Sequence, residues 1–158
     1  MNFLPINMNI EGKRILIIGG GRVGLHKAKI LHRFTDEATV ISASFLDGFS
    51  ELPFTQIRKE YEPSDLEGAF LVYVCTEKSE LNSRIKRDAE TRRILCSVCD
   101  SPALCDFTSP AIFKDGDIMV AVSSNAKDVH KSMSIRDSIK ECWDYLLNRK
   151  VTPQSIYH

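Results

Sequence analysis

The chain has 158 residues, of which 43% are hydrophobic and 27% are charged, and its 21 basic residues balance its 21 acidic ones. A chain of this length fits one domain and buries roughly 68–70% of its unfolded surface, which excludes a disordered protein. The balanced charge excludes the basic footprint of a protein that neutralises many phosphates, so we expect no nucleic-acid partner.

The apolar runs of the chain are short. Ile15–Ile18 is one of them, whereas a helix that spans a membrane needs about 20 apolar residues. Residues 1–6 lack the basic and apolar segments of a secretory signal. We therefore expect a soluble, cytoplasmic protein that binds no membrane.

Apolar segments alternate with amphipathic ones over the first two thirds of the chain, a pattern typical of a sheet wound with helices. Helices are expected over 22–34 and from Ser79, which offers an N-cap to a segment with apolar residues every four positions. Residues 1–110 are therefore predicted to form a Rossmann-type α/β domain with a doubly wound, mostly parallel sheet. The expected strands are 13–18, 38–42, 55–61, 69–75 and 94–98.

The pattern changes after residue 110. Segments 111–113 and 118–123 flank Asp115-Gly116, a turn signal that predicts a hairpin-like strand pair. A C-terminal helix is expected from about Lys127 to Leu147, ended by Thr152-Pro153. Its apolar stripe must pack on the chain's own sheet or on another subunit. The stripe consists of Ile135, Ile139, Trp143 and Leu146.

Five cysteines are scattered among apolar residues. In a cytosolic chain they are interpreted as buried, reduced thiols. The alternative is that Cys96-x-x-Cys99 forms a redox pair or half of a metal site. Side chains three apart on a strand point to opposite faces, and the sequence contains no second Cys-x-x-Cys. We therefore expect no bound metal. The cysteines are Cys75, Cys96, Cys99, Cys105 and Cys142.

Residues 19–24 match the pattern G-x-G-x-x-G between a predicted strand and a predicted helix, the context that indicates dinucleotide binding. Gly19 would allow a tight turn, Gly21 a close approach of pyrophosphate, and Gly24 close packing of helix and strand. The helix N-terminus would offer free N–H groups to the anion. The alternative is a glycine-rich turn that binds nothing.

An acidic residue about 20 positions further on normally binds the ribose hydroxyls. Here that stretch reads Val-Ile-Ser-Ala-Ser over 40–44, and it contains no arginine for a 2′-phosphate either. Backbone groups or hydroxyls around Ala43 and Ser44 would then hold the ribose. These residues decide only weakly between NAD and NADP.

Together with the glycine turn, several later segments form a recognisable series. In this order they resemble the precorrin-2 dehydrogenase family, which includes the N-terminal domain of siroheme synthase, from Phe3 to about Ser124. The segments are Phe3-Leu4-Pro5-Ile6, Glu11-Gly12-Lys13-Arg14, Gly19–Gly24 with Lys27-Ala28, Asp65–Val72, Val98–Pro102, Cys105-Asp106-Phe107 with Pro110-Ala111, and Val120–Ser124.

The resemblance implies an oxidoreductase that uses NAD to oxidise precorrin-2 to sirohydrochlorin in siroheme biosynthesis, and some relatives also insert iron. It implies that Asp100 is the general acid/base and that Ser124 lies near the tetrapyrrole substrate. It also implies a homodimer formed through residues 111–158. The implied NAD contacts are Arg22, Val23, Ala43, Ser44 and Thr76, beside Gly19, Gly21 and Gly24 of the turn.

The position of Asp100 agrees with this role, because it directly follows the fifth predicted strand and ligands of open α/β sheets bind at the carboxyl ends of strands. Alternatively, Asp100 only caps the Ser101-Pro102 turn, and Asp106 satisfies backbone groups near Phe107. Relatives usually carry two glycines where this chain has Asn125-Ala126. A non-catalytic nucleotide-sensing module or a degenerate subunit is therefore the alternative function.

Overall fold

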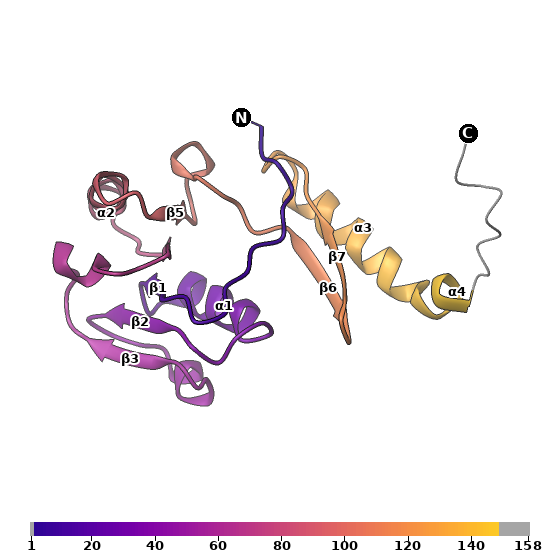
Figure 1. Cartoon of the computed structure of the whole chain (residues 1–158), viewed down its shortest axis with the longest axis horizontal. Helices are drawn as coiled ribbons and strands as arrows, with labels where there is room; N and C mark the ends of the chain where they lie inside the picture. The colour runs from indigo at the N-terminus through magenta and orange to yellow at the C-terminus, as the bar shows by residue number, and fades with distance from the viewer. Residues whose placement is uncertain (1, 149–158) are drawn as a thin grey trace. The chain divides into compact units, whose positions relative to one another are not determined.

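Five strands of four residues each form one parallel sheet in the order β3-β2-β1-β4-β5 (Figure 1). The order reverses between β1 and β4, the point at which a Rossmann sheet binds its ligand beyond the strands' carboxyl ends. The predicted fold class is confirmed. The strands are β1 (Ile15–Ile18), β2 (Thr39–Ser42), β3 (Thr55–Arg58), β4 (Leu71–Val74) and β5 (Leu95–Val98).

The computed structural model describes residues 2–148. Contacts divide it into a first unit, residues 3–108, and a second unit that begins at Ser109. Among the described residues, no helix is long and apolar enough to cross a membrane.

The sheet of the first unit is covered on both faces, because successive residues of a strand point to opposite sides. Leu16 packs in a cluster with α2 (Ser79–Thr91), whereas Ile17 packs in a cluster with α1 (Arg22–Leu31). All four side chains of β1 are buried. Burial on both faces explains why β1 is a continuous apolar run and not an alternating one.

Short 3-10 helices complete the connections of the first unit. The connection from β3 to β4 uses η2 in place of an α-helix, and η2 is held by a capping box between Glu62 and Asp65. Tyr61 joins this connection to α2 by donating a 2.9 Å hydrogen bond to Asp88. The 3-10 helices are η1 (Asp47–Glu51), η2 (Pro63–Leu66) and η3 (Pro102–Leu104).

Several predicted boundaries differ from the structure. The first helix ends at Leu31 and not at 34, because Phe34 N–H bonds Leu31 O in a tight final turn. The predicted N-cap at Ser79 is wrong: Ser79 is the first helical residue, and Lys78 occupies the N-cap. The third strand ends at Arg58 and not at 61, and the side chain of the next residue, Lys59, pairs with Glu62 and Asp65 at 2.7 and 2.9 Å.

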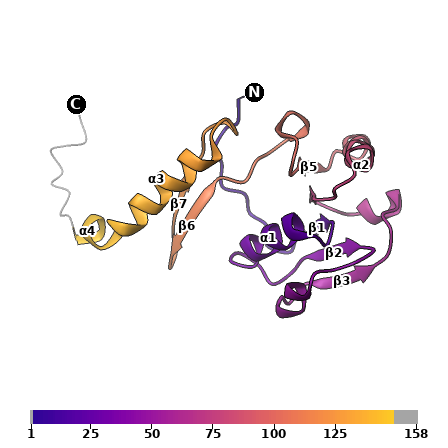
Figure 2. The same ribbon diagram turned by 180° about the vertical axis from the view of Figure 1, so that it is seen from behind.

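The second unit contains an antiparallel hairpin followed by helices. Strands β6 (Ala111–Asp115) and β7 (Ile118–Val122) pair around Gly116, whose φ of +55° suits a glycine. Helix α3 (Val129–Glu141) lies along this hairpin (Figure 2). The expected strand pair and C-terminal helix are both present.

The single helix expected to Leu147 is interrupted: α3 ends at Glu141, Cys142 forms its C-cap, and α4 (Trp143–Asn148) follows. Trp143 turns to its own hairpin, where its indole N–H donates to Asp115 at 2.6 Å and its ring meets that of Phe113. The predicted helix end at 152–153 lies outside the described residues.

Candidate cofactor and catalytic site

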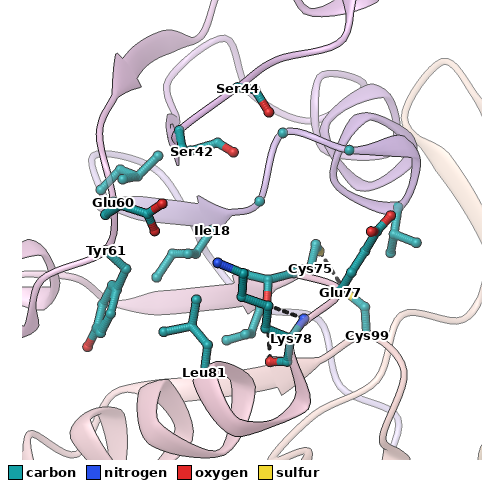
Figure 3. A pocket seen from close by; sticks show the side chains of 18 of the residues that line it. Ile18, Ser42, Ser44, Glu60, Tyr61, Cys75, Glu77, Lys78, Leu81 and Cys99 are labelled. Carbon is teal, nitrogen blue, oxygen red and sulfur yellow. Dashed lines mark hydrogen bonds between the residues drawn. The ribbon is translucent and has the colours of Figure 1, made fainter.

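A cavity of about 530 Å³ lies at the carboxyl ends of the sheet strands of the first unit (Figure 3). Its volume is in the range of cofactor and small-ligand sites. The structure brings most of the predicted site residues to its wall. These are Gly19, Gly21, Arg22, Val23, Ala43, Ser44, Thr76 and Asp100.

The glycine turn is packed so closely that side chains do not fit at three of its positions. Gly19 has φ +121°, and a Cβ there would lie 2.5 Å from the carbonyl oxygen of Cys75. A Cβ on Gly24 would lie 1.9 Å from the carbonyl oxygen of Gly19. The turn is thus pressed between the end of β4 and the start of α1.

Gly21 differs from these neighbours, because a Cβ at this position would meet nothing within 4 Å. It is the N-cap of α1, and no described side chain caps the helix there. The first N–H groups of a helix lack partners within it, so those of Arg22 and Val23 remain available at the cavity wall. This cradle fits an anionic pyrophosphate.

Gly20 is a site residue that sequence analysis missed. A Cβ on Gly20 would lie 2.1 Å from the carbonyl oxygen of Ser44, and Gly20 O accepts a 3.0 Å bond from Leu46 N–H. The loop after β2 therefore packs directly against the glycine turn. The sequence signal for Gly20 is that it lies in a run of three glycines. Its partner, Ser44, is 24 residues further along the chain, so only the fold reveals the contact.

The residues after β3 also line the cavity, and sequence analysis did not assign them. β3 pairs with β2 so that Arg58 lies opposite Ser42, and Glu60 lines the same cavity as Ser42 and Ser44 (Figure 3). Glu60 is exposed. It supplies a carboxylate to the cavity wall, where the acidic residue expected after β2 is missing.

Asp100 is held by a neighbour from α2. The amide of Asn82, which is only 2% exposed, donates to Asp100 Oδ1 at 3.4 Å and to the carbonyl oxygen of Thr76 at 3.0 Å. The hydroxyl of Thr76 donates to the Asn82 carbonyl oxygen. Asn82 thus links the ends of β4 and β5. The carboxylate of Asp100 therefore has a hydrogen-bond donor on α2.

Two cysteines meet at the same strand ends. Cys75 and Cys99 place their sulfurs 2.8 Å apart, and both line the cavity. Cys96 packs on the opposite face of the sheet from Cys99, as the strand geometry predicted. The expectation that the thiols are buried holds for Cys75 and Cys96, whereas Cys99 and Cys105 are partly buried. It is wrong for Cys142, which is exposed on the short segment between α3 and α4.

Asp106 satisfies a backbone group, but not one near Phe107 as expected. Its carboxylate accepts from Cys96 N–H at 2.9 Å and from the ammonium of Lys86 at 2.6 Å. Burial by itself lowers the pKa of Lys86, but the hydrogen bonds to Asp106 and Glu90 outweigh it and raise the pKa above 10.5. Within residues 2–148, no three His, Cys, Asp or Glu side chains are placed to hold a metal ion.

Ser124 lies in the second unit, in the turn that precedes α3. Its hydroxyl donates to the carbonyl oxygen of Asp128 and accepts from Asp128 N–H, at 2.8 and 3.0 Å. Asn125 and Ala126 follow with φ of +54° and +58°. Two consecutive residues in the left-handed region explain why glycines suit these positions.

A parallel sheet in this order, with a cavity at its switch point and an open glycine turn, defines a dinucleotide-binding Rossmann protein. Residues 6–111 match the sequence family described as "Putative NAD(P)-binding". The chain belongs to this family.

Two individual relatives with similar sequences are siroheme synthases. The chain is 33% identical to siroheme synthase 1 of Aeromonas hydrophila subsp. hydrophila over 144 residues, covering 89% of this chain and 31% of that protein. It is 35% identical to siroheme synthase of Ectopseudomonas mendocina over 145 residues, covering 90% and 31%. The chain thus spans about a third of the length of these curated relatives.

Among solved structures, "SirC, precorrin-2 dehydrogenase" aligns with a TM-score of 0.72 at 17% identity, covering 96% of this chain and 84% of that one. Its likeness supports the fold. The identities to the two siroheme synthases confirm the resemblance to the precorrin-2 dehydrogenase and siroheme synthase N-terminal domain family.

Proposed function

We propose that the protein is an NAD-dependent dehydrogenase that oxidises precorrin-2 to sirohydrochlorin in siroheme biosynthesis. The observation that carries the proposal is that one cavity holds both an open pyrophosphate cradle at Gly21 and the carboxylate of Asp100. A nucleotide sensor needs the cradle but has no use for a carboxylate at the end of β5. The similarity to siroheme synthases and to SirC, a precorrin-2 dehydrogenase, supports precorrin-2 as the substrate.

NAD, when bound, supplies a hydride acceptor. The N–H groups of Arg22 and Val23 would hold its pyrophosphate, while Ala43 and Ser44 would hold the ribose, with Thr76 close to the cofactor. Glu60 supports a preference for NAD, because its carboxylate lines the cavity together with Ser42 and Ser44 and would repel a 2′-phosphate. Replacing Glu60 by glutamine should therefore weaken discrimination against NADP, as measured by the ratio of kcat/KM for the two cofactors.

Asp100 would take the proton that leaves the substrate as the hydride departs. A carboxylate performs this step when it lies within reach of the reacting carbon, and Asn82 holds Asp100 at the cavity rim. Asn82 is thus a positioning residue in this proposal. Since Asn82 also binds the backbone of Thr76, it would align the proton acceptor with the cofactor side of the site.

The second unit would serve substrate binding and assembly. We assign Ser124 to the tetrapyrrole site and a two-fold homodimer to the apolar surface of residues 111–148. That surface exposes large hydrophobic side chains that a monomer would leave in water. They are Ile118, Met119, Val129, Met133, Ile135, Tyr145, Leu146 and Leu147.

Two variants separate binding from chemistry. Gly21→Val has room in the fold but would block pyrophosphate, so we expect it to stay folded and to lose NAD affinity in calorimetry. Asp100→Asn should bind NAD normally and oxidise precorrin-2 about 10²–10⁴-fold more slowly, the usual contribution of a general acid/base. Sirohydrochlorin and NADH absorbance report the reaction, and added Fe²⁺ tests iron insertion.

The outcomes decide between the alternatives. NAD binding without any precorrin-2 oxidation by the wild-type protein would establish a nucleotide-sensing module or a degenerate subunit. An Asp100→Asn variant that oxidises precorrin-2 at the wild-type rate would remove Asp100 from the mechanism. Unchanged NAD affinity in folded Gly21→Val would show that the turn does not bind pyrophosphate.

A further inference from the structure

The cofactor cavity contains two thiols to which the proposed reaction assigns no role. Cys75 follows β4 directly and Cys99 follows β5 directly, and the two strands are parallel neighbours with Val74 opposite Val98. Residues at equivalent positions of neighbouring parallel strands point to the same face, and the strands lie about 4.8 Å apart. The two sulfurs, 24 residues apart in sequence, are therefore 2.8 Å apart (Figure 3).

The local sequence suggests Cys96 as the partner of Cys99, but the fold places these two side chains on opposite faces of the sheet. Cys96 is separated from Cys99 by the sheet itself, because the two side chains belong to clusters on opposite faces. A disulfide has sulfurs about 2.05 Å apart, so closing the Cys75–Cys99 gap requires a movement of about 0.8 Å. Cys75 and Cys99 thus have the geometry of a disulfide pair, and Cys96-x-x-Cys99 does not.

The two thiols differ in reactivity. The hydrogen bond between Cys75 and Cys99 lowers the pKa of Cys99 below its usual range, with the Lys27 ammonium acting in the same direction. The same hydrogen bond and burial raise the pKa of Cys75. Cys99 is also partly exposed, whereas Cys75 is only 6% exposed. The thiolate is the nucleophilic form of cysteine, so we assign the more exposed Cys99 as the attacking sulfur.

We infer that Cys75 and Cys99 are a redox-active thiol pair that is reached through the cofactor cavity and closes to a disulfide by exchange with a small disulfide such as oxidised glutathione. The Cys99 thiolate attacks one sulfur of that disulfide, its S–S bond breaks, and one glutathione thiolate leaves and takes up a proton. The Cys75 thiol then gives up its proton and attacks Cys99 Sγ, releasing the second glutathione. Two protein thiols are oxidised and one glutathione disulfide is reduced to two thiols.

The test is a peptide map of the wild-type protein equilibrated with mixtures of oxidised and reduced glutathione. We expect a peptide that joins Cys75 to Cys99, lacks two hydrogens and disappears when dithiothreitol is added. Exposed Cys142 is the internal control, because its glutathionylation shows that the oxidant is active. A Cys96–Cys99 link, or glutathione on Cys142 with Cys75 and Cys99 still reduced, would overturn the inference.

Two variants test the order of attack. Cys75→Ser should retain glutathione on Cys99, because the resolving thiol is missing, whereas Cys99→Ser should leave Cys75 unmodified. In the reduced wild-type protein, iodoacetamide should label Cys99 at least about tenfold faster than Cys96, whose pKa burial raises to about 12. Equal labelling of Cys99 and Cys96 would show that Cys99 is not the attacking sulfur.

Entry of the oxidant through the cofactor cavity is tested separately, and this test rests on the proposed binding of NAD. NAD at ten times its Kd should slow disulfide formation about tenfold, since only the unliganded fraction reacts. If calorimetry shows NAD bound while the oxidation rate is unchanged, the oxidant does not enter through the cavity. If NAD does not bind, the proposed function fails, and the linked peptide still decides the redox chemistry.

Discussion

The two units of the chain differ in how they use their apolar residues. In the first unit, β1 is buried along its whole length and lies between two hydrophobic clusters. In the second unit, among the described residues, Ser132 is buried but no hydrophobic side chain is. A two-stranded hairpin with short helices is too small to enclose a core of its own. The first unit can therefore stabilise a site by itself, whereas the second leaves its large hydrophobic side chains exposed.

The largest expected effect tests the close packing of the first unit. Gly24→Val should cost about 3 kcal/mol or more, the upper end of overpacking effects, because its Cβ would lie 1.9 Å from Gly19 O. Gly21→Val is the matched control, and its free energy of unfolding should change by less than about 1 kcal/mol. Urea unfolding measures both. Similar losses in the two variants would show that crowding does not distinguish these positions.

The next effect concerns the ion pair beneath β5. Lys86→Met should cost about 1–2 kcal/mol, less than for a fully buried pair, because Asp106 is 37% exposed. The pKa of Lys86 is raised above 10.5 in the folded state. The contribution of Lys86 to the free energy of unfolding is therefore fully present below the unfolded-state pKa of the lysine. It is lost as the pH rises through the folded-state pKa.

Denaturant unfolding of the wild type and Lys86→Met between pH 7 and pH 11.5 measures this contribution. The difference between the two should be constant up to about pH 10 and shrink above it. Lys140→Met, an exposed change in the second unit, should stay within about 0.5 kcal/mol throughout. A Lys86 difference that does not depend on pH would assign the effect to packing of the lysine stem.

A smaller effect addresses the exposed surface of the second unit. Ile135 is 42% exposed, so Ile135→Asp should change the stability of an isolated chain little and weaken dimer association by about 1–2 kcal/mol. Sedimentation over a range of concentrations measures this. Trp143→Ala should also lower stability at every concentration, because Trp143 bonds Asp115 of its own unit. A wild-type monomer at high concentration would contradict the dimer.

The smallest effect concerns the turn before α3. Ala126→Gly should stabilise the protein by about 0.5–1 kcal/mol, since φ at this position is +58° and a Cβ is unfavourable there. Gly116→Ala is the reciprocal control, with φ +55° and open space around the added Cβ, and it should destabilise by a similar amount. Thermal unfolding detects both changes. If Ala126→Gly destabilised the protein and Gly116→Ala stabilised it, the left-handed backbone at these positions would not limit the stability of the second unit.

The sequence by itself determined the features that depend on local spacing. The largely apolar segments 13–18 and 69–75 identified the central strands β1 and β4, and the turn at 19–24 identified the start of α1. The opposite directions of Cys96 and Cys99 also followed, because side chains alternate along any strand. These are properties of residues within one turn or one strand, and neighbouring residues impose them.

Only the tertiary structure decided which distant residues meet. Strand pairing placed Cys99 beside Cys75 and brought Glu60 to the cavity that Ser44 also lines, while α2 placed Asn82 beside Asp100. The helix expected to reach Leu147 breaks near Trp143, which bonds a residue 28 positions earlier. Register and helix packing depend on how whole faces are buried. Periodicity reports only which face a residue occupies, so it does not identify the partner on that face.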